Sequence, residues 1–219
     1  MMEENEEENL KIVNELIEIE GLVDKKANDY EQIMYIYKSA LKVLNTKFEI
    51  LNEEFNNFYE YNPIDHITQR IKSPESIIDK MKKKELELTY RNLVEYINDV
   101  AGMRIICSFK DDVYKIVNII EDMRDVEIIK RKDYISNPKK SGYSSYHLIV
   151  KVPVNISNQL IYVKVEIQIR TVAMDFWASI EHKLKYKKGI NAKASKELVS
   201  MAKIMNKLDE KVMKIRYNT

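Results

Sequence analysis

The sequence predicts an α+β domain, in which a small mixed β-sheet is flanked by helices and extended by helices at both ends. Three observations indicate this class. The 219 residues include only four glycines and four prolines, so helices should predominate and loops should be short. Long stretches with an apolar residue at every third or fourth position enclose a middle part in which apolar and polar residues alternate. The sequence has no internal repeat and no linker rich in proline or glycine.

The first long helix is expected over residues 30–59. Its apolar residues recur at steps of three and four and form one stripe: Ile33, Tyr37, Ala40, Leu41, Leu44, Phe48, Leu51 and Phe55. Asn62-Pro63 should end it, because the residue before a proline disfavours the helical conformation. A short helix should follow Pro74, with Ser76 as its cap.

The middle of the chain then alternates strands with a helix. Strands are expected at residues 103–109, 126–130, 146–154 and 161–170, and a helix at residues 111–123. A helix should begin at Thr171, with Phe176 in the core and the place of Trp177 left open. The last helix carries apolar residues at a spacing that fits either a coiled-coil seam or packing on the core: Leu198, Met201, Met205, Leu208 and Val212.

These elements divide the chain into three parts. Residues 1–60 form an N-terminal helical extension, residues 61–190 a central domain, and residues 191–219 a C-terminal helix suited to oligomerisation.

The composition of the chain limits the binding partners and the cellular compartment that can be expected. Lys and Arg number 36 against 35 Asp and Glu, a formal net charge of +1 that argues against a duplex-DNA binder. The acidic start does not resemble a signal peptide, and no apolar run approaches the roughly 20 residues that span a bilayer. The single cysteine, Cys107, lies in an apolar run and is expected to be a buried thiol in a reducing compartment. We therefore expect a cytoplasmic protein with no membrane partner.

The strand at residues 161–170 has the most informative pattern. Its odd positions are valine or isoleucine, which leaves Lys164, Glu166, Gln168 and Arg170 on the other face, roughly 7 Å from one to the next. A glutamate can act as a base, a glutamine can donate and accept hydrogen bonds, and an arginine can hold phosphate. Taken alone, such a face is more often simply solvated.

Two other clusters suit phosphate and a metal ion. Three cations and a hydroxyl gather at a helix start, where phosphate binds readily: Arg70, Lys72, Ser76 and Lys80. Asp99 precedes a strand that contains Arg104, and one carboxylate there can bind Mg²⁺ when substrate phosphates supply further ligands. The plainer alternatives are an ordinary charged loop and a capping aspartate.

A third cluster opens the strand at residues 146–154. Residues 140–147 read KSGYSSYH, whereas a structural turn needs little more than the glycine. Tyr143, Ser145 and His147 share one side of an extended chain and offer stacking and hydrogen-bonding groups. The coincidence on one sheet of the strand face at residues 161–170, the cation cluster and Asp99 indicates a phosphate-handling site, and the pattern alone reaches no further than a nucleotide transferase.

Four blocks of the chain carry a family resemblance. They read HITQRIKSPESIIDK (66–80), NDVAGMRIICSF (98–109), RKDYISNPKKSGYSSYHLIVKVPV (131–154) and VKVEIQIRTVAMDFWASIEHKLKYK (163–187). In order and content they resemble the synthetase domain of the RelA/SpoT family, most closely its stand-alone small alarmone synthetases of the RelQ type. The resemblance covers roughly residues 60–190. The His-Asp metal motif of the family's hydrolase domain does not appear, so hydrolysis is not expected.

The resemblance implies a Mg²⁺-dependent GTP pyrophosphokinase. Such an enzyme transfers the β,γ-pyrophosphate of ATP to the ribose 3′-OH of GDP or GTP, with GMP as a further candidate, and yields AMP and an alarmone. By motif, the resemblance implies that the adenine should lie between Arg70 and Arg104. The ATP phosphates should then contact Lys72, Ser76, Lys80 and His147. Asp99 should bind Mg²⁺, with Glu166 as a second ligand.

The resemblance also assigns the acceptor side. Tyr143 should stack on guanine, with Lys139, Gln168 and Lys132 as further contacts. Glu166 is the candidate base for the 3′-hydroxyl. Since a free glutamate has a pKa of about 4.3, burial or a neighbouring acid would have to raise the pKa of Glu166 for that role.

The chain departs from the family pattern at several positions. Ser141 stands where Asn is common and Lys132 where Arg is frequent, which leaves the choice among GMP, GDP and GTP open. His66 and Asp175 replace an aromatic residue and a neutral amide of the relatives' allosteric cleft, so activation by pppGpp is not expected.

The sequence also allows expectations about the oligomeric state and about an alternative function. The resemblance implies a homotetramer. The alternative to an enzyme is a catalytically weak regulatory protein that binds nucleotides or single-stranded RNA, for which Lys139, Lys140 and the lysines of residues 183–188 offer a basic strip. A third hypothesis is a structural oligomer built on the terminal helices.

Overall fold

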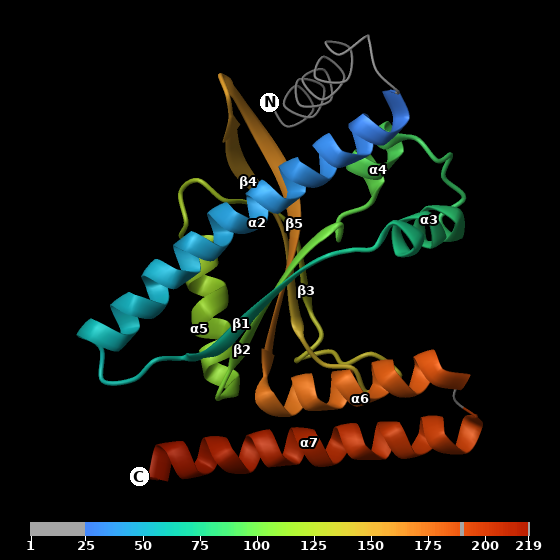
Figure 1. The fold of residues 1–219 in the computed structure, drawn as a ribbon. Helices are drawn as coiled ribbons and strands as arrows, with labels where there is room; N and C mark the ends of the chain where they lie inside the picture. Colours follow the sequence, from blue (N-terminus) through green and yellow to red (C-terminus); the bar gives the residue numbers. More distant parts are fainter. Residues whose placement is uncertain (1–24, 189–190, 219) are drawn as a thin grey trace.

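A five-stranded sheet forms the centre of the computed structural model, which describes residues 25–188 and 191–218 (Figure 1). Residues 1–24 of the expected N-terminal extension lie outside the described residues. The described elements are, in chain order, α2 (Lys25–Phe58), β1 (Ile64–Ile71), α3 (Pro74–Lys83), α4 (Tyr90–Tyr96), β2 (Ala101–Cys107), α5 (Lys110–Glu121), β3 (Glu127–Asp133), β4 (Tyr146–Ile156), β5 (Gln159–Thr171), α6 (Val172–Lys188) and α7 (Ala192–Asn218). The predicted α+β class is confirmed.

Strand β5 lies in the middle of the sheet, whose order is β1-β2-β5-β4-β3. It pairs in parallel with β2 and antiparallel with β4, while β1–β2 and β3–β4 are antiparallel. A parallel pair needs a long connection, and α5, β3 and β4 supply it between β2 and β5. The predicted mixed sheet is therefore confirmed. Strand β5, whose pattern is the most informative, is hydrogen-bonded to a neighbouring strand on each side.

The predicted alternation of β5 is also confirmed. Its odd residues from Ile161 to Ile169 are at most 5% exposed. Helices α2 and α5 cover this face of the sheet (Figure 1), and their apolar stripes belong to the same core, which contains Ile33, Tyr37, Leu41, Leu44, Phe48, Val113, Ile116 and Ile120. Because burial of apolar surface is the dominant favourable term in folding, this face fixes the register of β5. Glu166 and Gln168 are consequently presented on the opposite face.

Helices α6 and α7 lie side by side at one end of the sheet (Figure 1). Trp177 is 3% exposed, and its Nε1 donates a hydrogen bond to the carbonyl oxygen of Leu198 at 2.9 Å. Met201 and Met205 pack against the same cluster, so part of the apolar stripe of the last helix serves packing within the chain. The prediction of a core Phe176 is wrong. Phe176 is 51% exposed, because neighbouring helical residues point about 100° apart and Trp177 takes the inward position.

Strand β1 and helix α4 were not expected from the sequence. Ile64 is the only buried residue of β1, which lies at the edge of the sheet and shows no regular alternation. Cys107, by contrast, ends β2 fully buried, as predicted, and burial raises the pKa of its thiol. It is therefore a core residue and a poor nucleophile.

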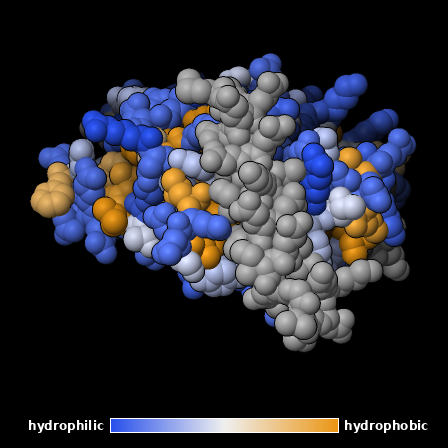
Figure 2. All heavy atoms as spheres, turned by 90° about the horizontal axis from the view of Figure 1, so that it is seen from above, coloured by the Kyte–Doolittle hydropathy of each residue, from blue (hydrophilic) through white to orange (hydrophobic). Residues whose placement is uncertain are grey.

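The surface mixes hydrophobic and hydrophilic residues. Figure 2 shows the molecule from above, where hydrophobic residues form separate patches among hydrophilic ones. Over residues 25–188 and 191–218, none of the helices has the length and apolar character needed to cross a membrane.

Candidate active site

Polar side chains of several strands form two rows across the sheet, on the face that α2 and α5 leave open. The strand registers align the first row as Thr68, Arg104, Gln168, His147 and Lys132. They align the second as Arg70, Gly102 and Glu166. Residues in register share a face of the sheet, so strand pairing brings together residues that are up to about a hundred positions apart in sequence. The glycine leaves room for Arg70, whose Cγ lies 3.6 Å from the point that a Cβ of Gly102 would occupy.

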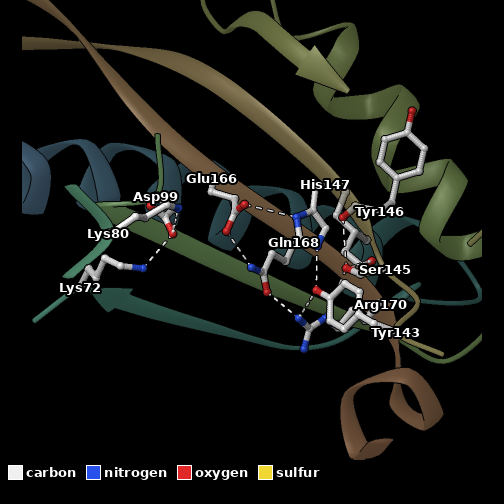
Figure 3. Close-up of polar contacts among 11 residues, drawn as sticks. Lys72, Lys80, Asp99, Tyr143, Ser145, Tyr146, His147, Glu166, Gln168 and Arg170 are labelled. Atoms are coloured by element: carbon white, nitrogen blue, oxygen red, sulfur yellow. Dashed lines mark hydrogen bonds and ion pairs between the residues drawn. The ribbon is translucent and has the colours of Figure 1, made fainter. Parts of the chain in front are cut away.

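Asp99 stands beside these rows, directly before β2, and two lysines bind it (Figure 3). Its Oδ2 lies 2.8 Å from Nζ of Lys72 and 2.7 Å from Nζ of Lys80. The backbone N–H of Lys72 donates to the carbonyl of Val100, which ties the end of β1 to the start of β2. Burial raises the pKa of Asp99, but the two lysines outweigh it and hold that pKa below its usual range. The other oxygen, Oδ1, is buried and has no hydrogen-bond partner within the part of the chain that the structure describes.

Glu166 lies further along the same face and accepts two hydrogen bonds (Figure 3). Its Oε1 is 3.2 Å from Nδ1 of His147, and its Oε2 accepts a bond of 2.7 Å from Nε2 of Gln168. Burial raises the pKa of Glu166, yet the hydrogen bonds from His147 and Gln168 hold it below the usual value. The condition stated above for an efficient base, a raised pKa, is therefore not met, because its partners stabilise the carboxylate form.

His147 connects Glu166 to the loop that precedes β4. Burial is the main reason why the pKa of His147 lies below its usual value, so the ring is neutral near pH 7. A neutral ring fits its neighbours if Nδ1 donates to Glu166 and Nε2 accepts from the hydroxyl of Tyr143, 2.7 Å away. The same hydroxyl accepts from Nη2 of Arg170 at 2.6 Å. Arg170 thus donates to Tyr143, Tyr143 to His147 and His147 to Glu166, which is the final acceptor of this chain of three hydrogen bonds.

The loop itself presents Tyr143 beside cations. Nζ of Lys139 lies 4.8 Å and Cζ of Arg170 lies 5.2 Å from the centroid of the Tyr143 ring. Gly142 turns the loop with a φ of +91°, and its N–H donates to the carbonyl of Lys139. A Cβ here would lie 2.5 Å from Cβ of Ala202 in α7, so both the backbone conformation and the close approach of α7 require glycine.

Two predicted residues stand apart from the others. The N-cap of α3 is Ser73, whose side chain accepts from the N–H of Ser76, so the prediction of Ser76 as cap is wrong. The reason is that Pro74 takes the first helical position and leaves the cap to the residue before it. Ser76 and Lys132 are exposed. In the described part of the chain, no hydrogen bond or ion pair joins either of them to Glu166 or Asp99.

The sequence related Asp175 only to the relatives' allosteric cleft, and its place beside Arg170 and Arg104 was missed. Its Oδ1 accepts from Nη1 of Arg170 at 3.0 Å and lies 3.2 Å from Nη1 of Arg104. A signal was present, because an acid in the first turn of a helix is favourable and this helix starts directly after β5.

A divalent metal ion has few protein ligands available here. Across the described ranges 25–188 and 191–218, three or more His, Cys, Asp or Glu side chains do not gather in a way that could hold a metal ion. Asp99 and Glu166 are close enough for the charge of Asp99 to raise the pKa of Glu166 slightly against its other partners. An ion at this place would therefore depend on one or two carboxylates and on ligands from a substrate.

Comparison with known proteins places these residues in a family. Residues 69–191 match the family described as a region found in RelA / SpoT proteins. GTP pyrophosphokinase YwaC of Bacillus subtilis (strain 168) is 47% identical over 190 residues, which cover 86% of this chain and 90% of that protein. GTP pyrophosphokinase YjbM of the same organism is 35% identical, over 85% of this chain and 88% of that protein.

Solved structures agree with the sequence relatives. The crystal structure of small alarmone synthetase 2 from Bacillus subtilis superposes with a TM-score of 0.79 at 46% identity and covers 87% of this chain and 100% of that one. That of small alarmone synthetase 1, bound to its product pppGpp, gives a TM-score of 0.82 at 34% identity, over 87% of this chain and 97% of that one. The chain belongs to the RelA/SpoT family.

Proposed function

We propose that this protein is an alarmone synthetase, a GTP pyrophosphokinase without hydrolase activity. It transfers the β,γ-pyrophosphate of ATP to the ribose 3′-OH of a guanosine nucleotide and releases AMP and (p)ppGpp or pGpp. The observation that carries this proposal is the placement of Glu166 on one open face of the sheet, between the Lys72–Asp99–Lys80 group and the Tyr143 loop. The relatives' names, GTP pyrophosphokinase and small alarmone synthetase, support it.

The donor nucleotide binds at the β1–β2 end of this face. Arg70 and Arg104 take the adenine between their guanidinium planes, since these planes stack on aromatic rings. Lys72 and Lys80 bind the phosphates, with Ser76 at the start of α3 and His147 as further contacts. A structural relative, small alarmone synthetase 1 from Bacillus subtilis, has been solved with AMPCPP bound, which supports an ATP site in this fold.

Mg²⁺ is the proposed cofactor, and the residues present fit it. The unpartnered, buried Oδ1 of Asp99 is an acceptor that a cation would satisfy, and Glu166 supplies a second carboxylate. When bound, the ion would offset negative charge on the transferred phosphates. Lys72 and Lys80 compensate the charge of Asp99 in the absence of substrate and can move to phosphate when the nucleotide enters.

The chemical step needs a group that accepts one proton. The 3′ oxygen attacks the β-phosphorus, the bond from that phosphorus to the oxygen bridging it to the α-phosphorus breaks, and AMP leaves with the bridging oxygen. The 3′-hydroxyl proton passes to Glu166. Because the pKa of Glu166 is low, it is a weak base that is ready in the carboxylate form. Most of the acceleration therefore comes from positioning and from compensation of phosphate charge.

The acceptor binds over the loop before β4. Guanine stacks on Tyr143, whose ring is already flanked by Lys139. Gln168 on β5 and Lys132 on β3 are further contacts, and each is paired in register with His147 on β4. GDP, GTP and GMP are all candidate acceptors. A complex of small alarmone synthetase 1 with pppGpp supports a guanosine nucleotide as the ligand.

We also propose a homotetramer that works in the cytoplasm. Ile204 and Leu208 form a second apolar stripe on α7 that is 58% and 48% exposed, respectively, and a second copy would cover it. Binding of single-stranded RNA stays a prediction, since the side chains of residues 185–188 lie outside the described part of its basic strip. The presence of both Asp99 and Glu166 in one site favours catalysis over a purely regulatory role.

A transfer assay tests the function. Purified protein, Mg²⁺ and ATP labelled at the γ-phosphate are incubated with GMP, GDP or GTP, and chromatography follows the label. We expect label on a 3′-pyrophosphorylated guanosine nucleotide, loss of transfer with EDTA, and at least about a 100-fold lower rate for Glu166→Gln. Folded wild-type protein that binds ATP but labels none of the three acceptors would refute the proposed function.

A further inference from the structure

One carboxylate oxygen connects an arginine of the donor side with an arginine of the acceptor side. Oδ1 of Asp175 accepts a hydrogen bond from Nη1 of Arg170 at 3.0 Å and lies 3.2 Å from Nη1 of Arg104. The side chain of Asp175 is 21% exposed, that of Arg170 is 5% exposed and that of Arg104 is 31% exposed, so both pairs are partly shielded. Ion pairs shielded in this way are screened less by solvent than the usual surface pair.

The two arginines would repel one another without this acid. Arg104 and Gln168 are paired in register, and Nη2 of Arg170 binds the side chain of Gln168, so the guanidinium groups are near neighbours. Burial is the largest cause that lowers the pKa of Arg104, the charge of Arg170 lowers it further, and Asp175 opposes both. Asp175 therefore compensates two positive charges at once.

The two arginines depend on Asp175 to different degrees. Arg170 has three further acceptors, namely Ser145 Oγ, Tyr143 Oη and Gln168 Oε1. Arg104 has Asp175 as its only ion-pair partner among residues 25–188 and 191–218, and its buried Nε has no hydrogen-bond partner. Removal of the carboxylate should leave Arg170 in place and release Arg104.

We propose that Asp175 is a positioning residue for the donor nucleotide, which holds the guanidinium plane of Arg104 in the orientation that stacks on adenine. This inference rests on the proposed synthetase function. It assigns a role in ATP affinity to a residue on α6, which lies outside the strands and the α3 region that supply the donor contacts. Because Arg170 also binds Tyr143 and Gln168, the same carboxylate joins the donor and acceptor ends of the site.

Binding and steady-state kinetics together test the role. Asp175→Asn keeps the shape of the side chain but removes the charge, and Glu121→Gln is a matched control that removes the carboxylate partner of Arg131 at the end of α5. Affinity is measured by calorimetry with AMPCPP, whose methylene group between the α- and β-phosphates blocks transfer. Loss of the ion pair between Asp175 and Arg104 should weaken AMPCPP binding and raise the KM for ATP about tenfold. The value of kcat and the KM for the acceptor should change less than about threefold, and Glu121→Gln should change neither nucleotide's affinity.

A double-mutant cycle identifies the residue through which Asp175 acts. In an Arg104→Gln background, Asp175→Asn should have no further effect on AMPCPP affinity, because the group that it positions is already absent. An unchanged or higher affinity of the single Asp175→Asn variant, equal losses on kcat and both KM values, or additive losses in the cycle would each overturn the proposal. If Arg104→Gln does not fold, the comparison of Asp175→Asn with Glu121→Gln still decides it. Failure of wild-type transfer in the same preparation would refute the proposed function separately, since AMPCPP binding does not depend on transfer.

Discussion

The Nδ1 atom of His147 lies 3.2 Å from Oε1 of Glu166, and this contact helps to hold the pKa of Glu166 below its usual value. Burial alone would have favoured the neutral acid. The imidazole receives support in turn from the hydroxyl of Tyr143, which is held by Arg170 (Figure 3). The pKa of Glu166, the proposed base, thus depends on a series of hydrogen-bonded side chains that starts at Arg170 on β5 and ends at Glu166 on the same strand.

Replacement of His147 by alanine should shift the pH dependence of the reaction. His147 lowers the pKa of Glu166, so its loss should raise that pKa and move the acid limb of the kcat/KM profile to higher pH. We expect kcat at neutral pH to fall about tenfold. His66→Ala is the control, because His66 is exposed and bonded to Asp65 outside the site. An acid limb that stays where the wild-type limb lies would contradict the coupling of His147 to Glu166.

Two substitutions of Tyr143 should separate its ring from its hydroxyl. Tyr143→Phe keeps the ring and removes the bonds to His147 and Arg170, so the KM for the guanosine nucleotide should change less than about threefold. Tyr143→Ala removes the stacking surface and should raise that KM about 10- to 100-fold. Initial rates at varied acceptor concentration measure both. Equal effects of the two variants on acceptor KM would show that guanine does not stack on this ring.

Asp99 should contribute to stability in a pH-dependent way. Its pKa in the folded state lies below the ordinary value, so its contribution is present above about pH 4 and is lost as the pH falls through the folded-state pKa. Asp99→Asn leaves Lys72 and Lys80 facing each other and should lower the free energy of unfolding by about 2 kcal/mol at neutral pH.

Urea unfolding at several pH values measures this difference. The gap between wild type and Asp99→Asn should shrink as the pH falls below about 4. Asp125→Asn, which breaks the more exposed pair with Lys47, should cost less than about 1 kcal/mol and serves as the control. A gap that grows on acidification would be inconsistent with the two ion pairs of Asp99.

The exposed stripe of α7 should mediate assembly. Ile204→Glu combined with Leu208→Glu places two charges on that stripe and should reduce the mass observed in sedimentation, because burial of an unpaired charge is costly. Lys207→Glu changes the charge of an exposed neighbour on the same helix and should leave the mass unchanged. Substitutions at Met201 and Met205 are less informative, since these residues pack against Trp177 within the chain. An unchanged mass for the double variant would remove this stripe from any interface.

The parts of the fold that were predicted depend on local patterns. Strict alternation predicted β5 and the polar face that carries Glu166 and Gln168, because one buried face demands a period of two. The stripe of α2 was equally clear. Strand β1 was not predicted, since an edge strand with a single buried residue leaves no such period and its charges resemble those of a loop.

The parts of the site that were not predicted depend on non-local pairing. Lys72 and Lys80 were expected to bind phosphate, but their common contact with Asp99 requires the antiparallel pairing of β1 with β2, and β1 was not predicted. The pairing of Asp175 with Arg104 depends likewise on the parallel register of β2 and β5. The sign of the Glu166 shift followed from hydrogen-bond partners that only the structure identifies.

The central place of β5 has a consequence for the order in which the protein can fold. Strand β5 follows the other four strands in sequence, yet it separates β2 from β4 in the sheet. During synthesis, β2 and β4 each wait with an unpaired inner edge until residues 159–171 leave the ribosome. The nascent chain therefore cannot form the site before β5 is synthesised, because the strand that joins the two halves of the sheet also carries Glu166. Insertion of β5 therefore completes the sheet and the site in the same late step, which pairs residues far apart in sequence. Such long-range pairing is slow, so aggregation is most favoured before β5 is in place.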